Sequence, residues 1–191
     1  MSITKLAVYC GSAEGNDPAF AQAAVELART MAAAGIDLVY GGGRLGLMGV
    51  MADTMLQAGG KVYGVIPQAL VDKEVAHLGL TELHMVDTMH ERKAKFTELS
   101  DGFVCLPGGI GTLDELFEAW TWNALGYHAK PFCLLNVNNF WSPLGDFMDH
   151  VRDAGFLSHA RRGQLMTARS PAEAINMLEN AAANANQGMV W

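Results

Sequence analysis

Short apolar runs alternate with longer segments of mixed polarity along most of the chain. The runs stop at glycine, proline or polar turns and predict β-strands, whereas the segments between them carry apolar residues at three- and four-residue spacing and predict helices. The predicted strands are 6–10, 37–40, 61–66, 81–86, 103–106, 132–135 and 164–167. The predicted helices are 17–34, a helix that follows Gly46 and ends near Gly59, 88–100, 113–124, 143–154 and 171–178.

Apolar strands that alternate with helices are typical of a parallel sheet with crossover helices on both faces. The pattern therefore predicts an α/β fold, a Rossmann-like doubly wound parallel sheet with helices on both faces. We expect one domain spanning residues 1–191, in which 181–191 is a loosely attached tail. Ligands of such sheets bind beyond the carboxyl ends of the strands. The segments that follow predicted strands in this way are 11–12, 41–46, 87–92 and 107–115.

The composition narrows the range of partners. The chain has 13 Lys and Arg against 20 Asp and Glu, a net charge of −7, so it offers no overall attraction to nucleic acid or to an anionic membrane. No apolar stretch reaches membrane-spanning length, and the N-terminus lacks the pattern of a signal peptide. Cys10, Cys105 and Cys133 lie in or beside apolar runs, as reduced thiols do, and no Cys or His spacing suggests a metal site. We expect a cytoplasmic protein that holds any anionic ligand locally.

Glycines follow the first and second predicted strands. Gly41, Gly43 and Gly46 fit G-x-G-x-x-G, the signature of a dinucleotide site, but the segment about 20 residues on, 61–66, holds no Asp or Glu for a ribose hydroxyl. The absence of an acidic residue at that spacing disfavours NAD as a ligand. Two interpretations stay open: the glycines allow a tight turn, or they let a ligand approach the backbone. The ligand-contacting residues would then be Gly11, Ser12, Gly42 and Gly43.

The turn after the fifth predicted strand favours phosphate binding. Its glycines free the backbone to point N–H groups inward, and the following helix adds its own unpaired N–H donors. The residues of this predicted phosphate cradle are Gly108, Gly109, Gly111 and Thr112. A plain glycine-rich connection is the alternative. Because a helix terminus contributes only about 0.3–1 kcal/mol toward an anion, we expect a cationic side chain to assist.

Glu115 has two interpretations. Thr112 and Glu115 fit the capping box T-x-x-E, in which the glutamate reaches back to the N–H of the cap residue. Glu115 also shares a helix stripe with Glu118 and Trp122, next to the expected core face and at the mouth of the predicted cradle. A carboxylate in that place repels an anion but suits a sugar or a developing cation.

Arg92 lies on the apolar stripe that Met89, Phe96 and Leu99 form along the predicted helix 88–100. An arginine there often packs its stem and extends its head to water. Beside a phosphate site, its guanidinium would instead give bidentate, charge-assisted hydrogen bonds to a ligand. By its own pattern the neighbouring Lys93 belongs to the solvated surface.

Three segments together resemble the LOG (LONELY GUY) family of cytokinin riboside 5′-monophosphate phosphoribohydrolases, long mislabelled as lysine decarboxylases. They are GGGRLGLMG at 41–49, MHERK at 89–93 and PGGIGTLDE at 107–115, and the resemblance runs from Ala7 to about Phe156. Membership implies hydrolysis of the N-glycosidic bond of a purine nucleoside 5′-monophosphate, carrying adenine or N6-modified adenine, to free base and ribose 5-phosphate. This chemistry calls for no metal or redox cofactor.

The resemblance also implies roles for particular residues. Arg92 and Glu115 are the implied catalytic pair, and Met89 and Lys93 are implied to line the same pocket. The residues implied to hold the phosphate are Gly108, Gly109, Gly111 and Thr112. The chain departs from the family where it has WNAL at 122–125 instead of the frequent W-x-Q-L, and where Asp114 replaces a frequent Glu. These departures bear on base preference and on the subunit contact.

Two further hypotheses concern function and assembly. The same cradle would suit a protein that binds a nucleotide or a cofactor without catalysis, whereas PLP-dependent decarboxylation is disfavoured because no lysine stands out as a Schiff-base site. Large aromatics on two faces of the predicted helix 113–124 favour a homodimer, with Trp120 packed inward and Trp122 outward at a two-fold contact.

Overall fold

The computed structural model describes residues 3–71 and 76–187. Its strands are β1 (Lys5–Tyr9), β2 (Asp37–Tyr40), β3 (Val62–Pro67), β4 (Glu82–Val86), β5 (Gly102–Cys105), β6 (Phe132–Leu135) and β7 (Leu165–Ala168). Its α-helices are α1 (Pro18–Ala33), α2 (Gly46–Gln57), α3 (Met89–Leu99), α4 (Ile110–Ala124), α5 (Ser142–Asp153), α6 (His159–Gly163) and α7 (Pro171–Gln187). Two short 3-10 turns are η1 (Gln68–Leu70) and η2 (Val137–Asn139).

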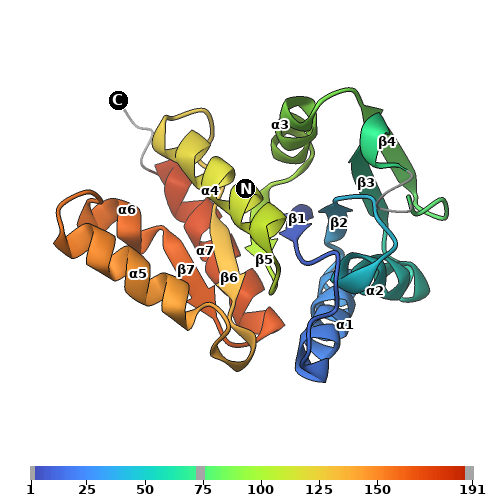
Figure 1. The fold of residues 1–191 in the computed structure, drawn as a ribbon, viewed down its shortest axis with the longest axis horizontal. Coiled ribbons are helices and arrows are strands. Elements are labelled where there is room, and N and C mark those ends of the chain that lie inside the picture. The colour runs from blue at the N-terminus through green and yellow to red at the C-terminus, as the bar shows by residue number, and fades with distance from the viewer. Residues whose placement is uncertain (1–2, 72–75, 188–191) are drawn as a thin grey trace.

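The strands form one parallel sheet in the order β4-β3-β2-β1-β5-β6-β7 (Figure 1). The central strand β1 places Ala7 opposite Val39 of β2 on one side and Phe103 of β5 on the other. The chain builds outward from β1 to β4 and then returns to β5, so the order reverses between β1 and β5. This confirms the predicted Rossmann-like doubly wound fold. A crevice for ligands opens at such a reversal, beyond the carboxyl ends of the strands.

Side chains alternate between two apolar layers, one on each face of the sheet. Leu6 and Val8 of β1 enter the layer that α1, α2 and α7 cover. Ala7 and Tyr9 enter the layer that α3, α4 and α5 cover. No helix in the described ranges is both long and apolar enough to cross a membrane.

Helix boundaries follow local signals at some positions and depart from the prediction at others. The Asp17 side chain caps α1 by accepting from the Ala19 N–H at 2.9 Å, as its position before Pro18 predicts. Helix α7 runs to Gln187, because the alanine-rich segment after Leu178 sustains it. The predicted loose tail is therefore helical over 181–187, and 188–191 lie outside the described residues.

Candidate active site

A cavity of about 400 Å³ opens at the carboxyl ends of β1 and β5, where the strand order reverses. It gathers residues from segments that are far apart in the sequence. They are Val8, Cys10, Gly11, Ser12, Gly41, Met48, Leu70, Met89, Arg92, Gly109, Ile110, Gly111, Thr112, Asp114 and Glu115. The structure therefore brings the predicted pair, Arg92 and Glu115, to one cavity with much of the predicted cradle.

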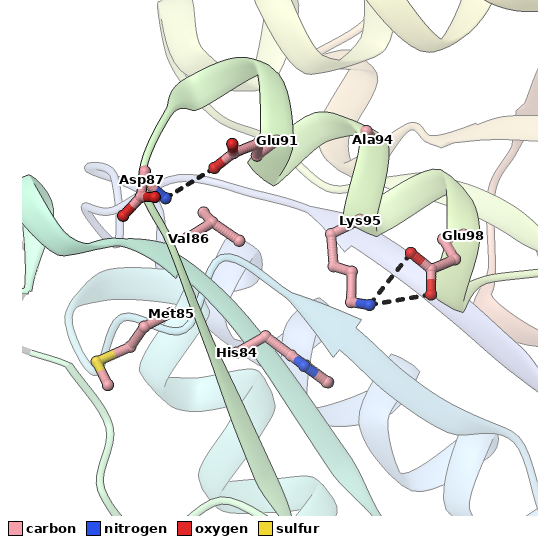
Figure 2. A pocket seen from close by; sticks show the side chains of 8 residues that line it. All are labelled: His84, Met85, Val86, Asp87, Glu91, Ala94, Lys95 and Glu98. Carbon is pink, nitrogen blue, oxygen red and sulfur yellow. Dashed lines mark hydrogen bonds and ion pairs between the residues drawn. The ribbon is translucent and has the colours of Figure 1, made fainter.

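A larger and more open hollow of about 620 Å³ lies between β4 and α3 (Figure 2). Three of its charged side chains already have local partners, since Lys95 contacts Glu98 at 2.9 Å and Glu91 accepts from the Asp87 N–H at 2.8 Å. None of the predicted site residues lines this hollow. The cavity beyond β1 and β5 is therefore the candidate active site.

Helix α4 begins at Ile110, earlier than the sequence predicts, with Gly109 as its N-cap. Thr112 is consequently inside the first turn, 3% exposed, and Glu115 is a residue of the helix interior. The expected capping box between Thr112 and Glu115 is therefore wrong. The first N–H groups of α4 have no acceptor within the helix, and Ile110, Gly111 and Thr112 line the cavity. A helix N-terminus thus faces the cavity, as a phosphate cradle requires.

Gly108 packs the cradle against the loop that follows β1. A side chain there would collide with the Thr112 hydroxyl and would come within 2.9 Å of the Gly11 nitrogen. The Gly11 N–H donates to the Pro107 carbonyl at 3.1 Å, which fastens the two loops together. Gly108 itself lines a neighbouring apolar hollow of about 280 Å³ with Gly11 and Phe20, so its role here is close packing.

Arg92 enters the cavity from the first turn of α3. A capping box starts this helix, because Thr88 accepts from the Glu91 N–H and the Glu91 carboxylate accepts from the Thr88 N–H. The arginine is only 4% exposed. Its Nε donates to the Val65 carbonyl at 3.1 Å and its Nη2 to the Gly41 carbonyl at 2.9 Å. The ends of β2 and β3 thus fix a buried cation, which excludes the interpretation of a head that extends to water.

The charge of Glu115 acts on side chains at the end of β1. Burial raises the pKa of Tyr9 well above its ordinary value, and the Glu115 carboxylate raises it further. The same two causes, burial first, raise the pKa of the Cys10 thiol. A thiol held protonated is a poor nucleophile. The Cys10 thiol is therefore not a candidate nucleophile, and Glu115 is the candidate reactive group on this wall of the cavity.

Lys93 does not line the cavity. Its Nζ pairs with Asp114 at 2.8 Å and with Glu118 at 2.5 Å, and both carboxylates belong to α4. Burial lowers the pKa of Lys93, but its hydrogen bonds with the two carboxylates outweigh that effect and raise the pKa. The lysine thus joins α3 to α4, which lie next to each other in Figure 1. It is neither solvated surface nor, in this structure, a residue of the pocket wall.

The glycines after β2 divide between packing and the cavity. Gly42 has a φ of +78° and packs against Ile66 and Leu83, and Gly43 pairs with Ala76 in an antiparallel bridge. Neither lines the cavity. Gly42 and Gly43 therefore serve the tight turn and do not contact a ligand in this cavity. Gly41 lines the cavity, and its carbonyl accepts from Arg92.

Several residues of the cavity wall were not predicted as site residues from the sequence. Val8, Cys10, Met48, Leu70, Ile110 and Asp114 also line it. Most lie within a few residues of a predicted segment, so the signal that could have found them is position at a strand end. Leu70 is the exception, because it belongs to η1 in the connection between β3 and β4.

The fold and this cavity define a Rossmann-like α/β protein in which a helix N-terminus faces a cavity at the switch point of the sheet. A family model described as "Possible lysine decarboxylase" matches residues 48–178. A cytokinin riboside 5′-monophosphate phosphoribohydrolase of Rhodococcoides fascians is 44% identical over 88% of this chain and 85% of its own length. The protein of that name in Oryza sativa subsp. japonica, LOG, is 42% identical over 98% of this chain and 77% of its own length.

The chain therefore belongs to the LOG family, as the three sequence segments indicate. A solved structure agrees with the fold. The structural-genomics target TM1055 superimposes with a TM-score of 0.69 at 27% identity, over 94% of this chain and 99% of that one.

Proposed function

We propose that this protein hydrolyses the N-glycosidic bond of a purine nucleoside 5′-monophosphate, with adenine or N6-modified adenine as the base. The products are the free base and ribose 5-phosphate. One observation carries the proposal: the buried Arg92 and the Glu115 carboxylate line one cavity together with the N-terminus of α4. The relatives named as phosphoribohydrolases support the same reaction.

The length of the first turns of α4 suits a ribose 5-phosphate. With the phosphate on the N–H groups at Ile110, Glu115 lies five residues farther, about 7.5 Å along the helix axis. Because the Cα–Cβ bond of a helical residue is tilted toward the N-terminus of its helix, the Glu115 side chain reaches back over part of this distance toward the sugar of a ribose 5-phosphate. We assign the phosphate to Gly109, Gly111 and Thr112, and the anomeric carbon to the neighbourhood of Glu115.

The reaction needs a water molecule and charge stabilisation. The bond from the anomeric carbon to the base nitrogen breaks, and its electron pair leaves with the base, which gains a proton. The positive charge that develops on the sugar is stabilised by the Glu115 carboxylate, or Glu115 removes a proton from the water that attacks the anomeric carbon. Arg92 holds the substrate or assists departure of the base. Every step uses residues of this chain, water and the substrate.

Decarboxylation by way of a lysine Schiff base finds no support in the cavity. Among the residues that the structure describes, no lysine lines it. Lys93 is nearby, but its ion pairs keep it protonated and a Schiff base needs the free amine. A protein that only binds a nucleotide is the remaining alternative. Release of free adenine from AMP distinguishes an enzyme from such a binding protein.

Selectivity for monophosphates follows from a phosphate held on α4. We expect kcat/KM for AMP to exceed that for adenosine at least tenfold, because one charge-assisted hydrogen bond contributes about 1.5 kcal/mol and the anchored phosphate positions the ribose. Free adenine measured by chromatography from matched concentrations of AMP and adenosine tests this. Equal kcat/KM values would contradict a phosphate site at the N-terminus of α4.

We also propose a homodimer, formed around the outer side of α4. Trp120 is buried against Phe132 of β6, whereas Trp122 contacts the rings of His90 and Tyr127 nearer the surface. Beside it, Leu125 is 65% exposed and Tyr127 is 74% exposed. An apolar surface next to the catalytic helix favours a self-complementary two-fold contact.

The mass in solution tests the dimer. We expect light scattering at micromolar concentration to give twice the chain mass of 20.5 kDa, and Leu125→Glu to shift the protein toward the monomer. A wild-type protein that scatters as a monomer would refute the assembly.

We further propose that residues 1–191 act as one nucleotide-binding domain in the cytoplasm. The single sheet supports the first part, and three buried thiols without disulfides support the second.

A further inference from the structure

The connection between β3 and β4 crosses the carboxyl edge of the sheet beside the candidate active site. Parallel strands are usually joined through an α-helix. The described part of this connection, 68–71 and 76–81, instead has η1 and a loop. Leu70 of η1 lines the cavity. With so little regular structure, these described parts of the connection need contacts with their neighbours to hold one position.

His77 makes two such contacts, with Gly42 and with Asp53, and a third contact within the connection itself. Its backbone N–H donates to the Gly42 carbonyl at 2.9 Å, and its Nδ1 accepts from the Gly79 N–H at 3.1 Å. A neutral ring that accepts at Nδ1 carries its proton on Nε2. That nitrogen lies 3.0 Å from the Asp53 carboxylate of α2. The imidazole is only 14% exposed, so both ring nitrogens are committed and the ring is fixed.

These contacts lead to Arg92 through the turn after β2. Ala76 pairs with Gly43 in an antiparallel bridge, next to the bond from His77 to Gly42. The preceding residue, Gly41, accepts from the Arg92 Nη2 at 2.9 Å. A shift of the turn would therefore move the carbonyl that orients the guanidinium.

We propose that His77, held by Asp53, is a positioning residue for the reaction. The pair fastens the connection between β3 and β4 onto Gly42 and Gly43, and so fixes the direction from which Gly41 holds Arg92. Neither His77 nor Asp53 lines the cavity. This inference rests on the proposed release of base from a 5′-monophosphate.

Substitutions can separate the two bonds of the imidazole. His77→Asn keeps an acceptor near the Gly79 N–H but cannot reach Asp53, whereas His77→Gln keeps a donor that reaches Asp53. We expect kcat for AMP to fall about tenfold in His77→Asn and in Asp53→Ala, because small displacements of a catalytic group cost that much or more. His77→Gln should stay within about threefold of the wild type. The double variant with His77→Asn and Asp53→Ala should be no slower than either single variant.

A second histidine pair provides the matched control. Glu82 on β4 lies 3.4 Å from the ring of His84, which borders the hollow in Figure 2. The Glu82 side chain is 56% exposed, similar to the 62% of the Asp53 side chain. Glu82→Ala should turn over AMP like the wild type. A loss in Glu82→Ala equal to that in Asp53→Ala would overturn the inference, and so would wild-type kcat in folded Asp53→Ala and His77→Asn. Thermal unfolding establishes that each variant is folded, and a loss of kcat explained entirely by unfolded protein also counts against the inference.

A binding measurement separates this inference from the proposed function. If the wild type releases no adenine from AMP, the proposed function fails, and calorimetric affinity for AMP then decides the role of the pair. Affinity about tenfold weaker in Asp53→Ala, with Glu82→Ala unchanged, supports positioning of Arg92 by His77. Unchanged affinity in Asp53→Ala overturns it.

Discussion

Glu115→Gln is expected to lower kcat for AMP about 100- to 1000-fold and to leave the protein folded. The substitution removes only the negative charge, which stabilises the developing positive charge on the sugar or activates water, and such groups typically contribute this much. The capping function that could have complicated the result is absent, because α4 begins at Ile110 and Glu115 lies inside the helix. Glutamine is nearly as favourable as glutamate in a helix interior.

A substitution three residues along the same helix is the control. Glu118→Gln makes the same chemical change, but Glu118 pairs with Lys93 and does not line the cavity. We expect its kcat to stay within about threefold of the wild type, because Asp114 still pairs with Lys93. AMP should bind Glu115→Gln at least as tightly as the wild type, since a repulsion toward the phosphate is removed. Near-normal turnover by folded Glu115→Gln would show that the carboxylate takes no part in the reaction.

The start of α4 shows how a correct local rule can give a wrong boundary. Thr112 and Glu115 fit a capping box, and the same kind of signature at Thr88 and Glu91 does start α3. At α4 the extended backbone of Gly109 starts the helix first. The N–H groups that a side chain would otherwise cap line the cavity there. A sequence rule that assumes a side-chain cap misses a helix whose uncapped N-terminus faces a cavity.

The strands and their ends could be predicted from the sequence, whereas the hydrogen-bond and ion-pair partners of Lys93 and Arg92 could not. Each predicted strand is present, because apolar runs bounded by glycine or proline depend on nearby residues alone. The partners of Lys93 lie on the next helix, and those of Arg92 lie at Val65 and Gly41, at the ends of two other strands. No spacing along the chain encodes those distances. The sequence therefore indicates which groups to expect at the site, and the packing of helices on the sheet decides their neighbours.

Arg92→Lys is expected to lower kcat/KM for AMP about 100-fold although the positive charge remains. The guanidinium is planar and presents five donors, so it can bond to Val65 and Gly41 and still face the cavity. A lysine ammonium is a single point with three donors and cannot reproduce that fork. A displaced cation in a site that depends on alignment costs about two orders of magnitude.

The stability of Arg92→Lys must be measured beside its activity, because a buried carbonyl that loses its donor costs about 1–3 kcal/mol. Arg161→Lys is the control: Arg161 is partly buried and, like Arg92, donates from Nη2 to a backbone carbonyl, that of Ala124 at 2.7 Å, but it lies outside the cavity. We expect both variants to lose free energy of unfolding to a similar degree in urea titrations. Only Arg92→Lys should lose kcat/KM beyond what its unfolded fraction explains. Equal activity in the two variants would mean that Arg92 serves to hold β2 and β3 together, and that the substrate is bound by other groups of the cavity.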